Sequence, residues 1–238
     1  RILAGNDKSD SGGKITFLKH IRIAFLEQEF AHDPEKDIFT QVMDSSKQFT
    51  EGLDDDGLFL PDYVAFAKRY YGGAVKRSEL EAELRAQLER ALSCGVNITH
   101  IDSHQHTHVL PGINSLVLKL SNEYNIIRVR IPKEGYLFTG GFQTGVGRLI
   151  GRSGLSFCAD MAALRADSLG LRHPQHFYGM LAGGHLNAQL IANILRQLPE
   201  GVSEIMTHPG LDSAALGKAF SWQYHWREEL DAYLDAGN

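Results

Sequence analysis

The stretches Val96-Asn-Ile-Thr-His-Ile101 and Asn125-Ile-Ile-Arg-Val-Arg-Ile131, with residues 113–124 between them, decide the fold class of this sequence. The two outer stretches are rich in β-branched residues and predict strands. Residues 113–124 carry apolar side chains at helical spacing and predict a helix. Because a parallel strand pair needs a crossover connection that is usually a helix, the sequence predicts a βαβ unit.

The same alternation continues on both sides of this unit. Strands are predicted at 2–5 and 21–26, around 177–181 and at 202–206, and helices within 156–169, at 187–198 and at 221–234. A further helix is predicted to begin at a capping box formed by Ser78 and Glu81, to carry a leucine stripe, and to stop at Gly95. The pattern predicts one α/β domain over 1–238 with mostly parallel strands, closed or nearly closed as a (β/α) barrel.

Composition excludes several classes of partner. The net charge of −5 argues against nucleic acid, which requires clustered Lys and Arg. No run of 18 apolar residues predicts a membrane span, and the first residues lack the apolar core of a signal peptide, so we expect a cytoplasmic protein. Cys94 and Cys158 are predicted to be buried thiols. A homodimer remains open.

Four histidines and an aspartate follow the strand predicted at 96–101 at a constant spacing of two: His100, Asp102, His104, His106 and His108. In an extended chain, side chains two residues apart point to the same face. Converging imidazoles with one carboxylate are ligands that suit Zn²⁺, Ni²⁺, Co²⁺ or Fe²⁺. They do not resemble the all-oxygen cages that bind Ca²⁺. Three protein ligands are expected, with one position left open, and the alternative is a set of solvated loop histidines.

Two more polar groups follow predicted strands. His208 in Glu204-Ile-Met-Thr-His-Pro-Gly210 is either a ligand or general acid and base, or a structural residue before a turn. Asp7, which follows the first predicted strand, is either a ligand or a turn residue.

Aromatic residues alternate near the C-terminus. Trp222, Tyr224 and Trp226 are a candidate aromatic rim for a sugar face, although tryptophan in a helix more often belongs to the core. Residues 227–230 are expected to form the solvated face of the last helix.

The motifs Thr99-His-Ile-Asp-Ser-His-Gln-His-Thr-His-Val-Leu-Pro111, Arg130-Ile-Pro-Lys-Glu134 and Glu204-Ile-Met-Thr-His-Pro-Gly210 resemble the YdjC-like family. This family includes chitooligosaccharide and hopanoid-associated deacetylases. The resemblance implies a distorted (β/α) barrel related to polysaccharide deacetylases, one divalent metal ion, and hydrolysis of an N-acetyl group from an amino sugar. The expected ion is Zn²⁺ or Mg²⁺, with Ni²⁺, Co²⁺ or Fe²⁺ as alternatives.

The resemblance also implies residue roles. His104 matches the metal-binding imidazole of the histidine run, and His208 matches a histidine near the reacting amide. The Asp-Asp pair of the family, a base followed by a ligand, corresponds here to Asn6-Asp7, and Ala24 stands where the family has a ligand histidine. Asn6 cannot accept a proton from water, so a replacement base such as Asp10 or Asp102 is needed for activity.

Two functions are therefore expected. The first is a metal-dependent carbohydrate deacetylase that acts on a small carbohydrate. The second is a catalytically impaired relative that binds carbohydrate, which the residues Asn6 and Ala24 favour. The expected site residues are the metal ligands Asp7, His104, His106 and His108, the catalytic residues Asp102 and His208, with Asp102 orienting an imidazole, and the substrate contacts Arg130 and Trp222.

Overall fold

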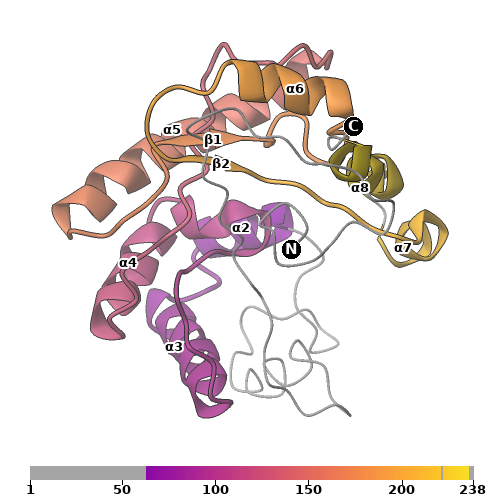
Figure 1. Cartoon of the computed structure of the whole chain (residues 1–238). Helices are drawn as coiled ribbons and strands as arrows, with labels where there is room; N and C mark the ends of the chain where they lie inside the picture. Colours follow the sequence, from indigo (N-terminus) through magenta and orange to yellow (C-terminus); the bar gives the residue numbers. More distant parts are fainter. Residues whose placement is uncertain (1–62, 221, 236–238) are drawn as a thin grey trace. The chain divides into compact units, whose positions relative to one another are not determined.

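The computed structural model describes residues 63–220 and 222–235, and Figure 1 shows the order of their helices and strands. The chain divides into two compact units, each assembled from separate stretches. Within the described residues, unit 1 comprises 132–156, 174–220 and 222–235, and unit 2 comprises 63–131 and 157–173. The strands predicted at 2–5 and 21–26 lie outside the described residues. The expectation of a single domain stays a prediction.

Unit 2 contains three helices and a 3-10 helix along its first stretch: α2 (Tyr63–Tyr71), α3 (Arg77–Ser93), η1 (His104–Val109) and α4 (Ile113–Glu123). The helix predicted at 113–124 is therefore confirmed. One apolar cluster joins α2, α3 and α4, with the buried members Val75, Leu80, Ile113, Leu116 and Val117 and with Phe66 and Tyr70 of α2 packed against them. The leucine stripe of α3 is buried at Leu80 and exposed at Leu92, so only its first half contributes to the core. Gly95, at φ 77°, follows the helix as predicted.

The start of α3 differs from the prediction. Its N-cap is Lys76, no side chain caps the first turn, and Ser78 lies inside the helix. The predicted capping box is therefore wrong. Glu81 is used differently, because its carboxylate accepts a hydrogen bond from Lys119 of α4 at 2.5 Å.

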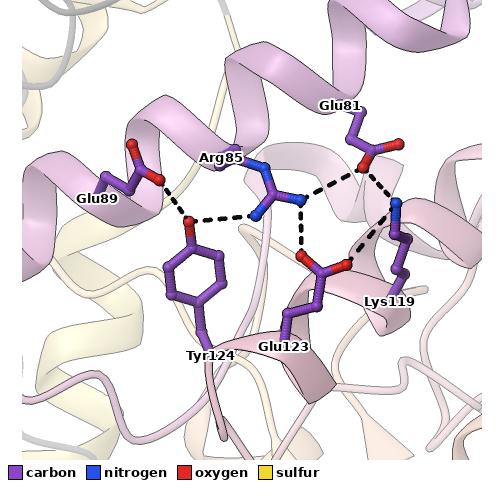
Figure 2. Close-up of polar contacts among 6 residues, drawn as sticks. All are labelled: Glu81, Arg85, Glu89, Lys119, Glu123 and Tyr124. Carbon is purple, nitrogen blue, oxygen red and sulfur yellow. Dashed lines mark hydrogen bonds and ion pairs between the residues drawn. The ribbon is translucent and has the colours of Figure 1, made fainter.

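Polar side chains connect α3 with α4 and the residue after it (Figure 2). The Arg85 guanidinium lies 2.6 Å from the Glu123 carboxylate and 3.4 Å from that of Glu81. The Tyr124 hydroxyl donates to Glu89 at 2.7 Å. Exposed ion pairs contribute little one at a time, but a connected network holds two helices in register more effectively.

Parallel pairing in unit 2 is confirmed, although the predicted strands are much shorter. Ile101 forms a parallel bridge with Val129, and Arg128 forms one with Arg172. The Ile101 N–H donates to the Arg128 carbonyl at 3.0 Å, and the Arg130 N–H donates to the Ile101 carbonyl at 2.9 Å. Within the described part of the chain, the segments predicted as strands at 96–101 and 125–132 form these single bridges in place of continuous strands.

Helix α5 (Val146–Ser168) is 23 residues long and begins well before the predicted start at 156. Gly147, Gly151 and Gly154 lie in its first half, and the low helix propensity of glycine concealed this half in the sequence. Residues 146–156 belong to unit 1 and the remainder to unit 2. Cys158 on this helix is a free thiol, half-buried like Cys94, so the expectation of two buried thiols is wrong.

Unit 1 is built around a second parallel pair. Its elements are β1 (His176–Tyr178), α6 (Ala188–Arg196), β2 (Ser203–Ile205), α7 (Ser213–Ala219) and α8 (Trp226–Asp235). β1 and β2 are parallel, with Phe177 opposite Glu204, and α6 connects them, which confirms the predicted strand, helix and strand. Asn187 caps α6 by accepting the Leu190 N–H at 3.0 Å. Leu190, Ile191 and Ile194 form the buried face of α6 and belong to one apolar cluster with Tyr178 and Ala232.

The last predicted helix begins later than expected. α8 starts at Trp226, because Gln223 has a φ of 55°, which a right-handed helix does not allow. The short helix α7, which the sequence did not reveal, is capped by Asp212, whose carboxylate accepts the N–H groups of Ala214 and Ala215.

A buried carboxylate anchors the turn that follows β1. Glu134 is 1% exposed and accepts the N–H groups of Gly179, Met180 and Leu181 at 2.8, 3.1 and 3.0 Å. Burial raises the pKa of Glu134, and the three N–H groups and Arg152 oppose this shift. The Glu134 carboxylate thus supplies the hydrogen-bond acceptor for the backbone N–H groups of residues 179–181.

In the described stretches, no helix is both long enough and apolar enough to span a membrane.

Candidate functional site

The histidine run begins in extended backbone and then turns. Ser103 has extended φ and ψ angles, whereas residues 104–109 form the 3-10 helix η1, and Gln105 and His106 within it have φ angles of 53° and 58°. The predicted extended alternation through His108 is therefore wrong, because the chain reverses after Ser103. Left-handed backbone is costly for non-glycine residues and is concentrated at functional sites.

The turn distributes the imidazoles differently from an extended strand. His104 is exposed, whereas His106 and His108 are 8% and 1% exposed. The centroids of the His106 and His108 rings lie 6.3 Å apart. The three side chains that the period-two spacing placed on one face are thus divided between solvent and core.

His108 has partners at both ring nitrogens. Its Nε2 lies 2.7 Å from the Arg130 carbonyl oxygen, and its Nδ1 lies 2.7 Å from the Ser103 hydroxyl. A carbonyl oxygen only accepts, so Nε2 donates and Nδ1 of the neutral ring accepts from Ser103. Burial lowers the pKa of His108 and favours this neutral form. In this arrangement the imidazole ties the histidine run to residue 130, and its predicted role as a ligand would require one of these bonds to break.

Asp102 and Arg130 are brought together as an ion pair between Asp102 Oδ2 and Arg130 Nη1. Asp102 Oδ1 also lies 3.8 Å from His108 Nδ1. These three residues, which the sequence proposed separately, are adjacent because Ile101 and Val129 are bridged in parallel. The roles of Asp102 as orienting carboxylate and of Arg130 as substrate contact stay predictions.

The donors in the described residues do not complete a metal site by themselves. Within 63–220 and 222–235, no three His, Cys, Asp or Glu side chains gather so that they could hold a metal ion. Asp7 lies outside the described residues. The imidazole donors suit a divalent cation, but a three-ligand site would need at least one donor from elsewhere in the chain.

His208 follows β2 in unit 1 and is held by a carboxylate that the sequence did not single out. The His208 N–H donates to Glu229 Oε2 at 2.5 Å, and the Leu186 N–H donates to Glu229 Oε1 at 3.0 Å. Glu229 is 0% exposed, so its assignment to the solvated face of the last helix is wrong. The buried residues Trp226 and Ala232 lie three positions on either side of it, a helical spacing that would have placed Glu229 on the inner face.

Burial and hydrogen bonding shift the pKa of Glu229 in opposite directions. Burial raises its pKa, and the N–H groups of Leu186, His208 and Gly184 oppose this shift. A carboxylate in this position fixes the backbone of the His-Pro-Gly turn relative to residues 184–186. The imidazole of His208 is thereby carried on an ordered turn.

The His208 ring packs against the ring of Tyr224. Its ring centroid lies 4.7 Å from that of Tyr224. Trp222 is 37% exposed, whereas Trp226 is 6% exposed and belongs to the core. The role of Trp222 as a substrate contact stays a prediction. A further imidazole nearby, His185, packs edge-on against His225 at 4.5 Å, and burial, followed by His225 and Arg148, lowers its pKa.

Comparison with known proteins places this chain in a family. A family model described as YdjC-like protein matches residues 36–237, and the chain belongs to the YdjC-like family. The match includes the histidine run and the His-Pro-Gly turn, whereas Asn6, Asp7 and Ala24 lie before it.

Curated relatives in several organisms are named carbohydrate deacetylase. The protein of Brevibacillus brevis is 38% identical over 148 residues, which cover 61% of this chain and 49% of the relative. Those of mouse and human are 29% and 30% identical, and each alignment covers 68% of this chain and 54% and 52% of the relative, respectively. The chain spans about half the length of the curated relatives it matches.

A solved structure from Enterococcus faecalis, provisionally described as a cellobiose-phosphate cleavage protein, has a similar fold. Its TM-score is 0.54 at 16% identity, over 80% of this chain and 67% of the other. Together with the parallel pairs, this similarity establishes an α/β fold with parallel strands.

Proposed function

We propose that the protein is a metal-dependent hydrolase that removes an N-acetyl group from an amino sugar or a small oligosaccharide. Its relatives are named carbohydrate deacetylase, and the family match includes both histidine motifs. The observation that carries the proposal is the left-handed pair Gln105 and His106 inside the histidine run. Two adjacent residues of this kind cost about 1–3 kcal/mol each, and a functional demand on His104 and its neighbours accounts for that cost.

The proposed metal ligands are His104 and Asp7, and His106 or His108 completes the set. A bound Zn²⁺ or Mg²⁺, or alternatively Ni²⁺, Co²⁺ or Fe²⁺, would lower the pKa of water and polarise the amide carbonyl. Asp7 supplies the donor from outside the described residues that a three-ligand site requires.

The proposed proton donor is His208. An imidazole titrates near neutral pH and can protonate the amine that leaves the sugar. Glu229 fixes the backbone nitrogen of His208 at 2.5 Å, so the ring works from an ordered turn. Asp102 is proposed to orient His108, and Arg130 to contact the substrate from its place beside Asp102.

For the fold, we propose that the parallel pairs belong to a distorted (β/α) barrel of the polysaccharide-deacetylase type. The succession of strand, helix and parallel strand supports this, since such units build (β/α) barrels.

A binding protein without hydrolytic activity is the second candidate. It is favoured by Asn6 and Ala24, which stand where the resemblance expects the family's base and a ligand histidine. The two candidates differ in whether acetate is released.

The test measures bound metal per chain and then acetate release from N-acetylglucosamine oligomers, with and without a chelator. We expect stoichiometric metal and chelator-sensitive release, and we expect His104→Ala to lose both while its circular dichroism stays that of the wild type. The matched control is His173→Ala, because His173 pairs with Asp167 at 3.1 Å outside the histidine run of the same unit. Full metal occupancy without acetate release would favour the binding protein.

A further inference from the structure

The outward face of helix α5 (Figure 1) carries a stripe of large apolar side chains that no described part of the chain covers. At 3.6 residues per turn the stripe occupies an arc of about 60° and is about 27 Å long. The opposite face is buried at Ala159, Ala162 and Ala166, so α5 has one apolar face toward the chain and a second toward solvent. The members of the stripe are 46–71% exposed: Val146, Ile150, Phe157, Met161 and Leu164.

No charged side chain interrupts this stripe. Arg148, Arg152 and Asp160 fall within its length along the sequence, but helical geometry directs all three outside its arc. An ordinary surface helix has polar and charged residues on the face opposite its core. A continuous apolar patch in that place is typical of a surface that binds another molecule.

Two glycines lie along one edge of the stripe and have no role within the described chain. Gly147 and Gly154 are exposed. Glycine is a poor helix former. At either position an added Cβ would meet no atom of the described residues within 4 Å, the helix's own backbone left aside. A glycine on an exposed helix face leaves a notch that lets a second helix approach closely.

The order of the notches and the large side chains identifies the second helix. Both notches lie in the first part of the stripe, and its large side chains from Phe157 onward lie in the second. We consider a second copy of α5 packed antiparallel, with a twofold axis that passes between residues 155 and 156. One register then fills both notches. Its pairs are Gly147 with the partner's Leu164, Ile150 with the partner's Met161, and Gly154 with the partner's Phe157.

This self-complementarity favours a second copy over an unrelated partner. In a twofold interface the same patch serves on both subunits, and residue i contacts residue j where j contacts i. Helix α5 meets this requirement because it carries both the notches and the side chains that fill them. A parallel pair would place Gly154 against Gly154 and Phe157 against Phe157, which leaves the notches empty and makes the rings collide.

We propose that the outward face of α5 is the interface of a homodimer in which two α5 helices pack antiparallel. This inference goes beyond the proposed function, because neither histidine motif takes part in it. One helix face offers less area than the roughly 800 Å² per partner of a standard interface. The dimer is therefore expected to dissociate in the micromolar range.

Sedimentation velocity of the full chain over about 1 to about 100 μM tests the dimer. We expect the mass to rise from that of one chain to that of two. Phe157→Glu is expected to weaken association about tenfold or more, because it places a charge in the apolar interface. Gly154→Leu is expected to weaken it while circular dichroism stays that of the wild type, because the new side chain meets open space in the single chain. The matched control is Leu137→Glu, which introduces the same charge at a 96% exposed leucine outside α5 and is expected to leave association unchanged.

Cysteine substitutions test the register. In a background with Cys94→Ser and Cys158→Ser, the combination of Ile150→Cys and Met161→Cys is expected to give a disulfide-linked dimer under oxidising conditions. Ile150→Cys alone is expected to give none. Its copy on the partner would lie eleven residues away along the helix axis, about 16 Å, and a disulfide requires Cα atoms within about 7 Å.

The outcomes that would overturn the proposal are distinct. A wild-type chain that stays monomeric up to about 100 μM refutes the dimer. A dimer of unchanged affinity in both Phe157→Glu and Gly154→Leu uses another surface, which refutes the role of α5. Cross-linking through Ile150→Cys alone refutes the antiparallel register. A monomeric wild type that floats with phosphatidylcholine vesicles, and that Phe157→Glu releases from them, assigns this face to a membrane surface and refutes the second copy.

Discussion

Replacing Glu229 by alanine should both destabilise unit 1 and release the turn that carries His208. The side chain accepts backbone N–H groups of Leu186, His208 and Gly184 and is fully buried. Alanine leaves these donors without their acceptor. His208 is half-buried and can regain a water molecule, but Leu186 and Gly184 are buried.

The magnitude follows from the two buried donors. An unsatisfied buried donor costs about 1–3 kcal/mol, so Glu229→Ala should lower the free energy of unfolding by about 2–6 kcal/mol. Each kcal/mol corresponds to about 2–4 °C in Tm for a chain of this size. Glu229→Gln keeps the shape and one acceptor oxygen and should cost less than alanine.

The assay is guanidinium unfolding followed by circular dichroism. Glu228→Ala is the matched control, since Glu228 is the preceding residue on α8, is exposed, and its carboxylate lies 2.9 Å from the ring nitrogen of exposed His225. Its effect should stay within about 0.5 kcal/mol of wild type, as for other surface substitutions. An effect of Glu229→Ala as small as that of Glu228→Ala would refute the anchoring role.

The pH dependence of the glutamine variant has a defined sign. Burial raises the pKa of Glu229 above the ordinary value of a glutamate side chain. A group with a raised pKa contributes stability that is fully present below the unfolded pKa and is lost as pH rises through the folded pKa. The stability advantage of wild type over Glu229→Gln should therefore shrink as the pH rises from below the ordinary pKa of a glutamate through the raised pKa of Glu229. An advantage that grows over this window would contradict the direction of the shift.

Two further substitutions test the anchors of the two units. Glu134→Ala removes the acceptor of residues 179–181 and should lower the free energy of unfolding by about 2–6 kcal/mol, measured by denaturant titration; a loss below about 0.5 kcal/mol would contradict this. Arg85→Ala breaks the network between α3 and α4 in Figure 2 and should lower Tm, and this loss should shrink between about 0.1 and about 1 M salt as the Debye length falls from about 10 to about 3 Å. A Tm loss that is independent of salt would indicate lost packing instead.

The local elements could be predicted from the sequence because their signals are local. The apolar spacing of 113–124 and 187–198 predicted α4 and α6, and short apolar runs at 177–181 and 202–206 predicted β1 and β2. Helix α5 was predicted only in its second half, because three glycines interrupt the pattern in the first. The conformation of the histidine run was wrong, because a constant spacing of two does not reveal the left-handed turn at Gln105 and His106.

The sequence by itself determined the α/β class, the order of α3, α4, β1, α6, β2 and α8, and which histidines and carboxylates are candidates for chemistry. Only the tertiary structure decided that Glu134 and Glu229 are buried anchors and that His108 is held between Ser103 and Arg130. The partners of Glu134 and Glu229 lie 21 to 47 residues away along the chain. A buried carboxylate is stable only where folding brings several N–H donors to it, and no local pattern of residues records such a meeting.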